Sequence, residues 1–239
     1  MRFIIMHRTN AHWEAGAIPQ PDLIARVGTL LERMATAGIL RGAEGLRPSS
    51  EGVRLNFASG ARTITPGPLQ GRDELPSGFT IVRARSMDEA IEWATQQQTI
   101  LKDVEIDIRP VTEPWDIGVG DPPAGLSTRR YLILRKATLS TEVGDVPTPS
   151  QRSALARLND QAPSDVHLAT EVMRPSRRGR RYKNSREGIG VHDGPFTETK
   201  ELIGGYVIVL AASFEEADRW AREYMRVVNA DEVDLRELD

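Results

Sequence analysis

The chain contains no cysteine, and this absence excludes whole classes of chemistry. Without thiolates there is no disulfide bond, no cysteine nucleophile, no Cys-ligated zinc and no cysteine-held iron–sulfur cluster. Histidine is scarce, with four residues in 239, and no two of them stand at a metal-binding spacing such as His-x-x-x-His. A phosphate-cradling Gly-x-x-x-x-Gly-Lys loop is also missing. We therefore expect no metal site and no cofactor.

Neither sign of charge dominates, and long apolar runs are missing. The 31 Lys and Arg residues against 34 Asp and Glu residues give a formal net charge of −3, and 39% of the residues are hydrophobic. This composition is typical of a soluble globular protein of one or two domains and not of a disordered chain. The run Phe3–Met6 is too short for a secretory signal, and Tyr206–Ala212 is too short to span a bilayer. We expect a cytoplasmic protein without membrane contact.

The sequence repeats itself at a spacing of 127 residues. Matching residues include Glu44 and Glu171, Arg47-Pro48-Ser49 and Arg174-Pro175-Ser176, Gly67-Pro68 and Gly194-Pro195, Trp93-Ala94 and Trp220-Ala221, Asp107 and Asp234, and Arg109 and Arg236. Near the start the spacing is 128, which pairs Phe3–Met6 with Tyr131–Leu134. We interpret this as a tandem duplication, with a first repeat at residues 1–111 and a second at residues 129–239. Residues 112–128 are rich in Pro and Gly and form the linker.

The spacing of apolar residues predicts the same elements in both repeats. In the first repeat these are a strand at Arg2–Arg8, a helix from Pro21 up to Gly38, strands at Val53–Phe57 and Phe79–Arg83, a helix opened by the Ser86 and Glu89 capping box, and a strand at Glu105–Val111. The order βαββαβ predicts an α+β fold of two ferredoxin-like units. Because each such sheet leaves one face bare, we expect the units to pair as an intramolecular pseudo-dimeric α+β barrel with a cleft between the sheets. This plan leaves room for further homodimerisation.

The closing strands carry charge on alternate positions. Ile106 and Ile108 point to one face, whereas Glu105, Asp107 and Arg109 point to the other, and the second repeat has the same pattern. Charges commonly protect exposed sheet edges, so one interpretation is a solvated edge strand with cross-strand ion pairs. The other is a polar lining for the cleft.

The segment Val191-His192-Asp193-Gly194-Pro195-Phe196-Thr197-Glu198-Thr199-Lys200-Glu201 resembles the signature of the YCII-related superfamily, in its DGPF branch. Residues 43–48 and 202–206 also resemble that branch, and the similarity covers both repeats. The first repeat departs from the signature, with Thr65-Pro66-Gly67-Pro68-Leu69 and Arg72-Asp73-Glu74 in the matching places. The resemblance implies a dimeric α+β barrel. It implies little about activity, since the superfamily holds mostly uncharacterised proteins, a few of dehydrochlorinase type, and DGPF members linked by gene context to alternative sigma factors.

The candidate catalytic residues are His7, His12 and Asp193. His7 ends the first strand, where the second repeat has Arg135, so this position is either an anion site in each unit or a polar residue at the sheet rim. His12 lies in a loop that has no close counterpart in the second repeat. This loop either contacts a ligand or has diverged in sequence without a function. Asp193 either opens a turn or orients the imidazole of His7 or His12 as a general base, and Pro66 replaces it in the first repeat.

The candidate substrate-binding residues are Glu44, Arg47, Arg135, Glu171, Arg174 and His192. The recurring Glu and Arg pairs either support the fold or anchor a substrate through the guanidinium group. Seven basic residues crowd positions 174–186. We do not expect nucleic acid as their partner, because the net charge is negative, interleaved aromatic residues are lacking apart from Tyr182, and no groove-reading helix is predicted there. We expect a solvated hairpin arm, with an acidic partner or an anionic ligand as the alternative.

Two classes of function remain open. The first is a cofactor-independent lyase, isomerase or dehalogenase that acts on a small anionic molecule in one cleft. The second is a non-catalytic small-molecule-binding or regulatory protein, associated with transcription through the sigma-factor context that the resemblance implies.

Overall fold

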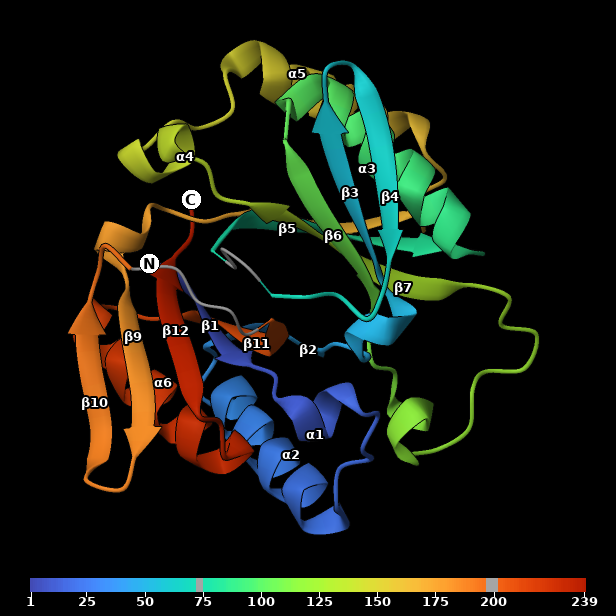
Figure 1. The fold of residues 1–239 in the computed structure, drawn as a ribbon. Coiled ribbons are helices and arrows are strands. Elements are labelled where there is room, and N and C mark those ends of the chain that lie inside the picture. Colours follow the sequence, from blue (N-terminus) through green and yellow to red (C-terminus); the bar gives the residue numbers. More distant parts are fainter. Residues whose placement is uncertain (72–74, 197–201) are drawn as a thin grey trace. The chain divides into compact units, whose positions relative to one another are not determined.

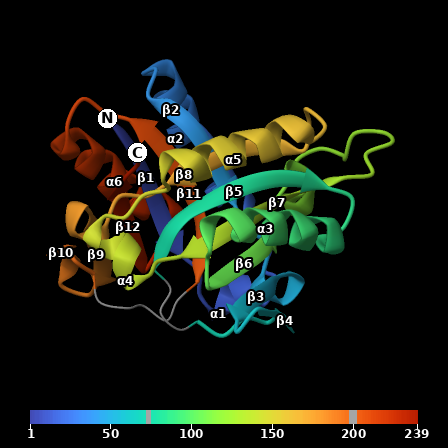
Figure 2. The same cartoon turned by 90° about the horizontal axis from the view of Figure 1, so that it is seen from above.

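The computed structural model describes residues 1–71, 75–196 and 202–239. The chain forms two compact units (Figures 1 and 2), which we name unit A and unit B. The described parts of Met1–Leu46 and Met173–Asp239 belong to unit A, together with Gly71. Arg47–Gln70 and Leu75–Val172 form unit B. The segments Arg72-Asp73-Glu74 and Thr199-Lys200-Glu201, in which the two repeats differ, lie outside the described residues.

Unit A is a six-stranded antiparallel sheet with its helices. Its elements are β1 (Arg2–Arg8), α1 (Ala11–Glu14), α2 (Pro21–Thr36), β2 (Leu40–Gly45), a 3₁₀ turn (Ser176–Arg178), β9 (Arg180–Ser185), β10 (Gly188–Asp193), β11 (Ile203–Leu210), α6 (Phe214–Val228) and β12 (Glu232–Glu237). The strand order is β10-β9-β12-β1-β11-β2.

Unit B repeats this plan. Its elements are a 3₁₀ turn (Ser49–Glu51), β3 (Val53–Ala58), β4 (Ala61–Pro66), β5 (Pro76–Ala84), α3 (Met87–Leu101), β6 (Glu105–Pro110), a 3₁₀ turn (Pro114–Ile117), β7 (Arg129–Lys136), α4 (Leu139–Val143), α5 (Pro149–Gln161) and β8 (His167–Val172). The strand order is β4-β3-β6-β7-β5-β8.

Both predicted repeats supply strands to both sheets. In unit A, β1 and β2 come from the first repeat and β9 to β12 from the second. In unit B, β3 to β6 come from the first repeat and β7 and β8 from the second. The inner orders β12-β1-β11-β2 and β6-β7-β5-β8 place the strands fourth, first, third, second, which is compatible with ferredoxin-like units. The α+β class is therefore confirmed. The compact units divide the chain differently from the predicted boundaries at 1–111, 112–128 and 129–239, which stay a prediction.

Two expectations about strands are wrong. Val53–Phe57 is not the second strand of the ferredoxin-like order, because it pairs with β4 in a hairpin beside β6, and Leu40–Gly45 takes the second place. The closing strands are not solvated edges either, since β6 lies between β3 and β7 and β12 lies between β9 and β1. Asp107 is accordingly 2% exposed and Asp234 is 0% exposed.

Each sheet packs its apolar face against helices. In unit A, Phe3, Ile5 and Val207 meet Leu30 of α2 and Ala221 of α6. In unit B, α3 and α5 lie against each other (Figure 2), and the core includes Ile106, Ile108, Ile133, Ala90 and Ala94. Both predicted capping serines are confirmed, because Ser86 Oγ accepts from the Glu89 amide and Ser213 Oγ accepts from the Glu216 amide. Among the described residues no helix is long and apolar enough to cross a membrane.

Candidate functional site

The Gly-Pro step of the signature is a tight backbone contact in both units. A Cβ on Gly67 would lie 1.8 Å from the carbonyl oxygen of Ser49, and a Cβ on Gly194 would lie 1.8 Å from that of Ser176. The two serine hydroxyls accept from the amide two residues after each glycine, at 3.1 Å in each unit. Only glycine leaves room for this approach. The Gly-Pro step therefore fixes the chain against the Pro-Ser turn.

Asp107 and Asp234 are each held between basic side chains. Asp107 accepts from Arg54 Nε at 2.6 Å and Nη2 at 2.8 Å, and Lys136 Nζ lies 2.7 Å from its Oδ2. Asp234 accepts from Arg181 Nε at 2.6 Å and Nη2 at 2.9 Å, and also pairs with Arg8. Burial is the largest influence and favours the neutral acid, but the combined effect of the surrounding cations keeps the pKa of both carboxyls below the usual value. Both are therefore ionised and poor proton acceptors.

Several basic residues of the 174–186 segment pair with the acidic end of the same unit. These pairs are Arg174 with Asp239, Arg178 with Glu237, Arg181 with Asp234, and Lys183 with Glu232. The hairpin of β9 and β10 exists, but the expectation of a solvated arm is wrong for Arg181, which is 3% exposed. Much of the segment's charge is thus compensated within unit A.

The ring of His7 contacts the phenol of Tyr224. Its Nδ1 lies 2.8 Å from the hydroxyl of Tyr224 on α6. Burial raises the pKa of Tyr224, so the phenol keeps its proton. Either group can donate this hydrogen bond, depending on the tautomer of the imidazole. In both cases Nδ1 is engaged with Tyr224.

The structure does not bring Asp193 to His7. Asp193 ends β10, three strands from β1, and its Oδ1 accepts from Arg180 Nε at 2.6 Å. His192 lies opposite Arg181 on the neighbouring strand and is exposed. His12 is exposed on α1, and its ring contacts Trp13 with centroids 4.8 Å apart. Their catalytic or substrate-binding roles stay predictions.

The recurring arginines have local acidic partners. Arg47 donates to Glu51 at 2.5 and 3.1 Å, and Arg174 pairs with Asp239. Their backbone carbonyls accept from Arg109 Nε at 3.0 Å and from Arg236 Nε at 3.1 Å. These contacts favour a structural role.

Glu44 and Glu171 occupy matching places in the two sheets. Glu44 lies on β2 opposite Tyr206 of β11, and Glu171 lies on β8 opposite Phe79 of β5. The two glutamates therefore hold the same position in the second strand of each ferredoxin-like order. Their substrate-binding role stays a prediction.

Arg135 stands at the sequence position that matches His7, and its surroundings differ. It is 5% exposed on β7, and its Nε donates to Asp103 Oδ1 at 3.2 Å. Among the described residues its two terminal nitrogens make no hydrogen bond. Burial raises the pKa of Asp103 above its usual value, against the effect of Arg135, and Asp103 Oδ2 is buried without a hydrogen-bond partner in the described chain. This pair is the candidate site.

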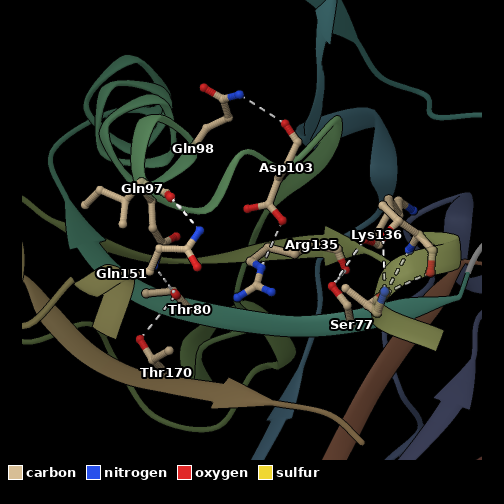
Figure 3. Close-up of polar contacts among 12 residues, drawn as sticks. Ser77, Thr80, Gln97, Gln98, Asp103, Arg135, Lys136, Gln151 and Thr170 are labelled. Carbon is tan, nitrogen blue, oxygen red and sulfur yellow. Dashed lines mark hydrogen bonds and ion pairs between the residues drawn. The ribbon is translucent and has the colours of Figure 1, made fainter. Parts of the chain in front are cut away.

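A polar layer continues from this pair between α3, α5 and the sheet of unit B (Figure 3). Gln97 Nε2 donates to Thr80 Oγ1 at 2.6 Å, and that hydroxyl lies 3.2 Å from Thr170 Oγ1. Thr170 Oγ1 in turn lies 2.8 Å from His167 Nε2, which is 3.3 Å from Asn159 Nδ2. Burial lowers the pKa of His167. The chain of contacts joins both helices to β5 and β8.

Three buried atoms of this layer lack a hydrogen-bond partner in the described part of the chain. They are Trp93 Nε1, Gln97 Oε1 and Asn159 Oδ1. An unsatisfied buried polar atom costs about 1–3 kcal/mol. Sequence reasoning missed this layer, because single polar residues on helix faces carry no motif.

No group of three or more His, Asp or Glu residues in the described ranges is arranged to hold a metal ion. The chemistry available to the described residues is therefore recognition by guanidinium, carboxyl, amide and hydroxyl groups.

Residues 130–237 match the family model of the YCII-related domain. This finding supports the resemblance to the YCII-related superfamily, whereas the DGPF branch and the tandem duplication stay predictions. The matched segment supplies β7, α5 and β8 to unit B, and β9 to β12 with α6 to unit A. Neither a curated protein nor a solved structure matches the chain.

Proposed function

We propose, with the YCII-related domain of residues 130–237 as the premise, that this protein binds a small anionic molecule and that Arg135 anchors it. The observation that carries the proposal is a buried guanidinium group that uses Nε on Asp103 and leaves two terminal nitrogens without a partner among the described residues. A planar guanidinium edge suits a carboxylate or phosphate group.

Asp103 makes this site sensitive to pH. A carboxylate beside Arg135 competes with an anionic ligand, whereas a protonated carboxyl can donate to it. Because burial raises the pKa of Asp103, the protonated form persists to higher pH than for an exposed aspartate. Anion binding therefore strengthens as pH falls through the pKa of Asp103.

Binding without catalysis is the function we favour. Asp193 contacts Arg180 and lies on β10, three strands from the β1 strand of His7, so the predicted acid–base pair of His7 and Asp193 is not assembled. The lyase, isomerase or dehalogenase hypothesis needs an imidazole and a carboxylate in reach of each other. A regulatory role linked to transcription is compatible with anion binding.

We further propose that the chain is a tandem duplication of the DGPF type whose two sheets form the pseudo-dimeric barrel. Two observations support this proposal. Gly67 and Gly194, which are 127 residues apart, make equivalent close backbone contacts. Asp107 and Asp234, which are also 127 residues apart, each accept hydrogen bonds from an arginine at the matching position of its own unit.

Isothermal titration with acetate, benzoate and inorganic phosphate at pH 5 and pH 8 tests the anion site. We expect saturable binding that is tighter at pH 5, and its loss in Arg135→Gln. Asp103→Asn should bind more tightly at pH 8 and lose the pH dependence. The control Arg85→Gln removes the same charge from an exposed position of unit B. Equal binding by Arg135→Gln and the wild type, or weaker binding at pH 5, would refute the proposal.

A further inference from the structure

A second site is suggested by the unpartnered atoms on α3. Trp93 and Gln97 are one helical turn apart and therefore project from the same side of the helix. Trp93 Nε1 is a donor and Gln97 Oε1 is an acceptor, and both are buried without a hydrogen-bond partner in the described chain. Gln97 is 1% exposed, and its amide nitrogen is already committed to Thr80.

We propose that this part of unit B binds a neutral group that presents an acceptor beside a donor, such as a carboxamide or a lactam. Its carbonyl oxygen accepts from Trp93 Nε1, and its N–H donates to Gln97 Oε1. The hydrogen bond from Gln97 Nε2 to Thr80 fixes which end of the side-chain amide faces the ligand. The ring of Trp93 is stacked with His167, with centroids 6.5 Å apart, which restrains the indole donor.

Unit A has fewer polar residues at the matching positions. The positions that match Gln97, Thr80, Thr170 and His167 at a spacing of 127 residues are Tyr224, Val207, Ala43 and Leu40. The strand pairings correspond, since Thr80 is opposite Thr170 just as Val207 is opposite Ala43. Val207 is fully buried and packs with Leu40 and Ala43 in an apolar cluster. Three of the four matching positions in unit A are therefore apolar, whereas the fourth, Tyr224, contacts His7. In our proposal the additional polar groups of unit B serve recognition.

This inference is independent of the anion site, because it uses neutral groups and a different set of side chains. A neutral ligand forms no ion pair with Arg135, so its binding at Trp93 and Gln97 should not change in Arg135→Gln. A negative result for one of the two sites therefore does not contradict the proposal for the other.

The test is an NMR titration of the full chain, labelled with ¹⁵N in its four tryptophan indoles. The indole signal of Trp93 is assigned from Trp93→Phe. We expect acetamide and 2-pyrrolidinone to shift that signal saturably, with dissociation constants in the millimolar range, and acetone, which offers only an acceptor, to bind about tenfold more weakly. A crystal soaked in acetamide should show it between Trp93 and Gln97.

Two variants and one control test this assignment. Gln97→Met keeps the side-chain length and should weaken acetamide binding about tenfold, while Trp220→Phe, the matched change in unit A, should leave it unchanged. Trp93→Phe, followed by calorimetry, should weaken binding about tenfold and serves as the second variant if Gln97→Met does not fold. The proposal is overturned if the Trp93 signal does not saturate, if Gln97→Met binds as well as the wild type, or if soaked crystals hold only water at this place.

Discussion

Replacing Asp107 with asparagine should strongly destabilise the protein. The carboxylate accepts two hydrogen bonds from Arg54 and lies 2.7 Å from Lys136 Nζ, with 2% of its side chain exposed. Asparagine preserves the shape but leaves both cations facing an uncharged amide. Breaking a buried ion pair from one side costs about 3–5 kcal/mol.

Glu105 provides a matched control on the same strand. It lies 3.4 Å from Arg54 Nε, but 23% of its side chain is exposed. Solvent screens such a pair, so Glu105→Gln should cost at most about 1 kcal/mol. The two variants remove the same charge beside the same arginine, and they differ in burial and in the partners of the carboxylate, since Asp107 also contacts Lys136.

Urea denaturation followed by circular dichroism measures the difference. With a slope of about 2–3 kcal/mol per molar, Asp107→Asn should lower the midpoint by about 1–2 M. The lowered pKa of Asp107 means that its contribution is present above its unfolded value of about 3.8 and is lost as pH falls through the folded value. The difference in unfolding free energy between Asp107→Asn and the wild type should therefore decrease as the pH is lowered.

The apolar variant Arg54→Met/Asp107→Leu/Lys136→Met should recover most of the lost stability, because well-packed apolar groups often replace buried ion pairs at little cost. If Asp107→Asn costs no more than Glu105→Gln at pH 7, the reasoning from burial is wrong.

Two further predictions follow from the backbone. Gly67→Ala and Gly194→Ala should each lower the free energy of unfolding by about 1–3 kcal/mol or more, because the new Cβ would meet a carbonyl oxygen at 1.8 Å. Gly190→Ala, whose Cβ finds its nearest neighbour at 3.7 Å, should change it by less than about 0.5 kcal/mol, and equal effects in thermal denaturation would count against this argument. Fragments 1–111 and 129–239 should be insoluble or unfolded when expressed alone and should form both sheets when expressed together, as judged by co-purification. A fragment that is monomeric and stably folded by itself would contradict the strand order.

Local signals predicted the individual elements well. The alternation at Arg2–Arg8, the proline at Pro21 and the capping serines Ser86 and Ser213 all have local physical causes, and the structure confirms them. The strand Leu40–Gly45 was missed because its two glycines and short apolar side chains leave no alternating pattern. The strand order was also missed, since pairing between residues about 200 positions apart, as in β1 with β11, leaves no local trace.

The charged clusters could have been predicted in part. The alternating pattern of the closing strands singled out Asp107 and Asp234 as charged, but it left open whether they face solvent and did not identify their partners. Arg54 and Arg181 are also 127 residues apart, so the repeat itself contained the missing signal. Asp103 and Arg135 lie in different predicted repeats, and only the folded sheet of unit B brings them together.

The sharing of strands between repeats has a genetic consequence. A single repeat of this kind could complete its sheets only with a second copy of itself, and any substitution would then alter both sheets alike. In the tandem duplication that we propose, the two sheets can change separately, but some polar contacts within a sheet join residues of both copies. His7 with Tyr224 and Arg135 with Asp103 each join one residue from either repeat. New specificity in one unit therefore requires matched substitutions in both copies. His7 and Tyr224 are 217 residues apart, whereas Arg135 and Asp103 are 32 residues apart, so recombination between related genes would separate the first pair far more often than the second.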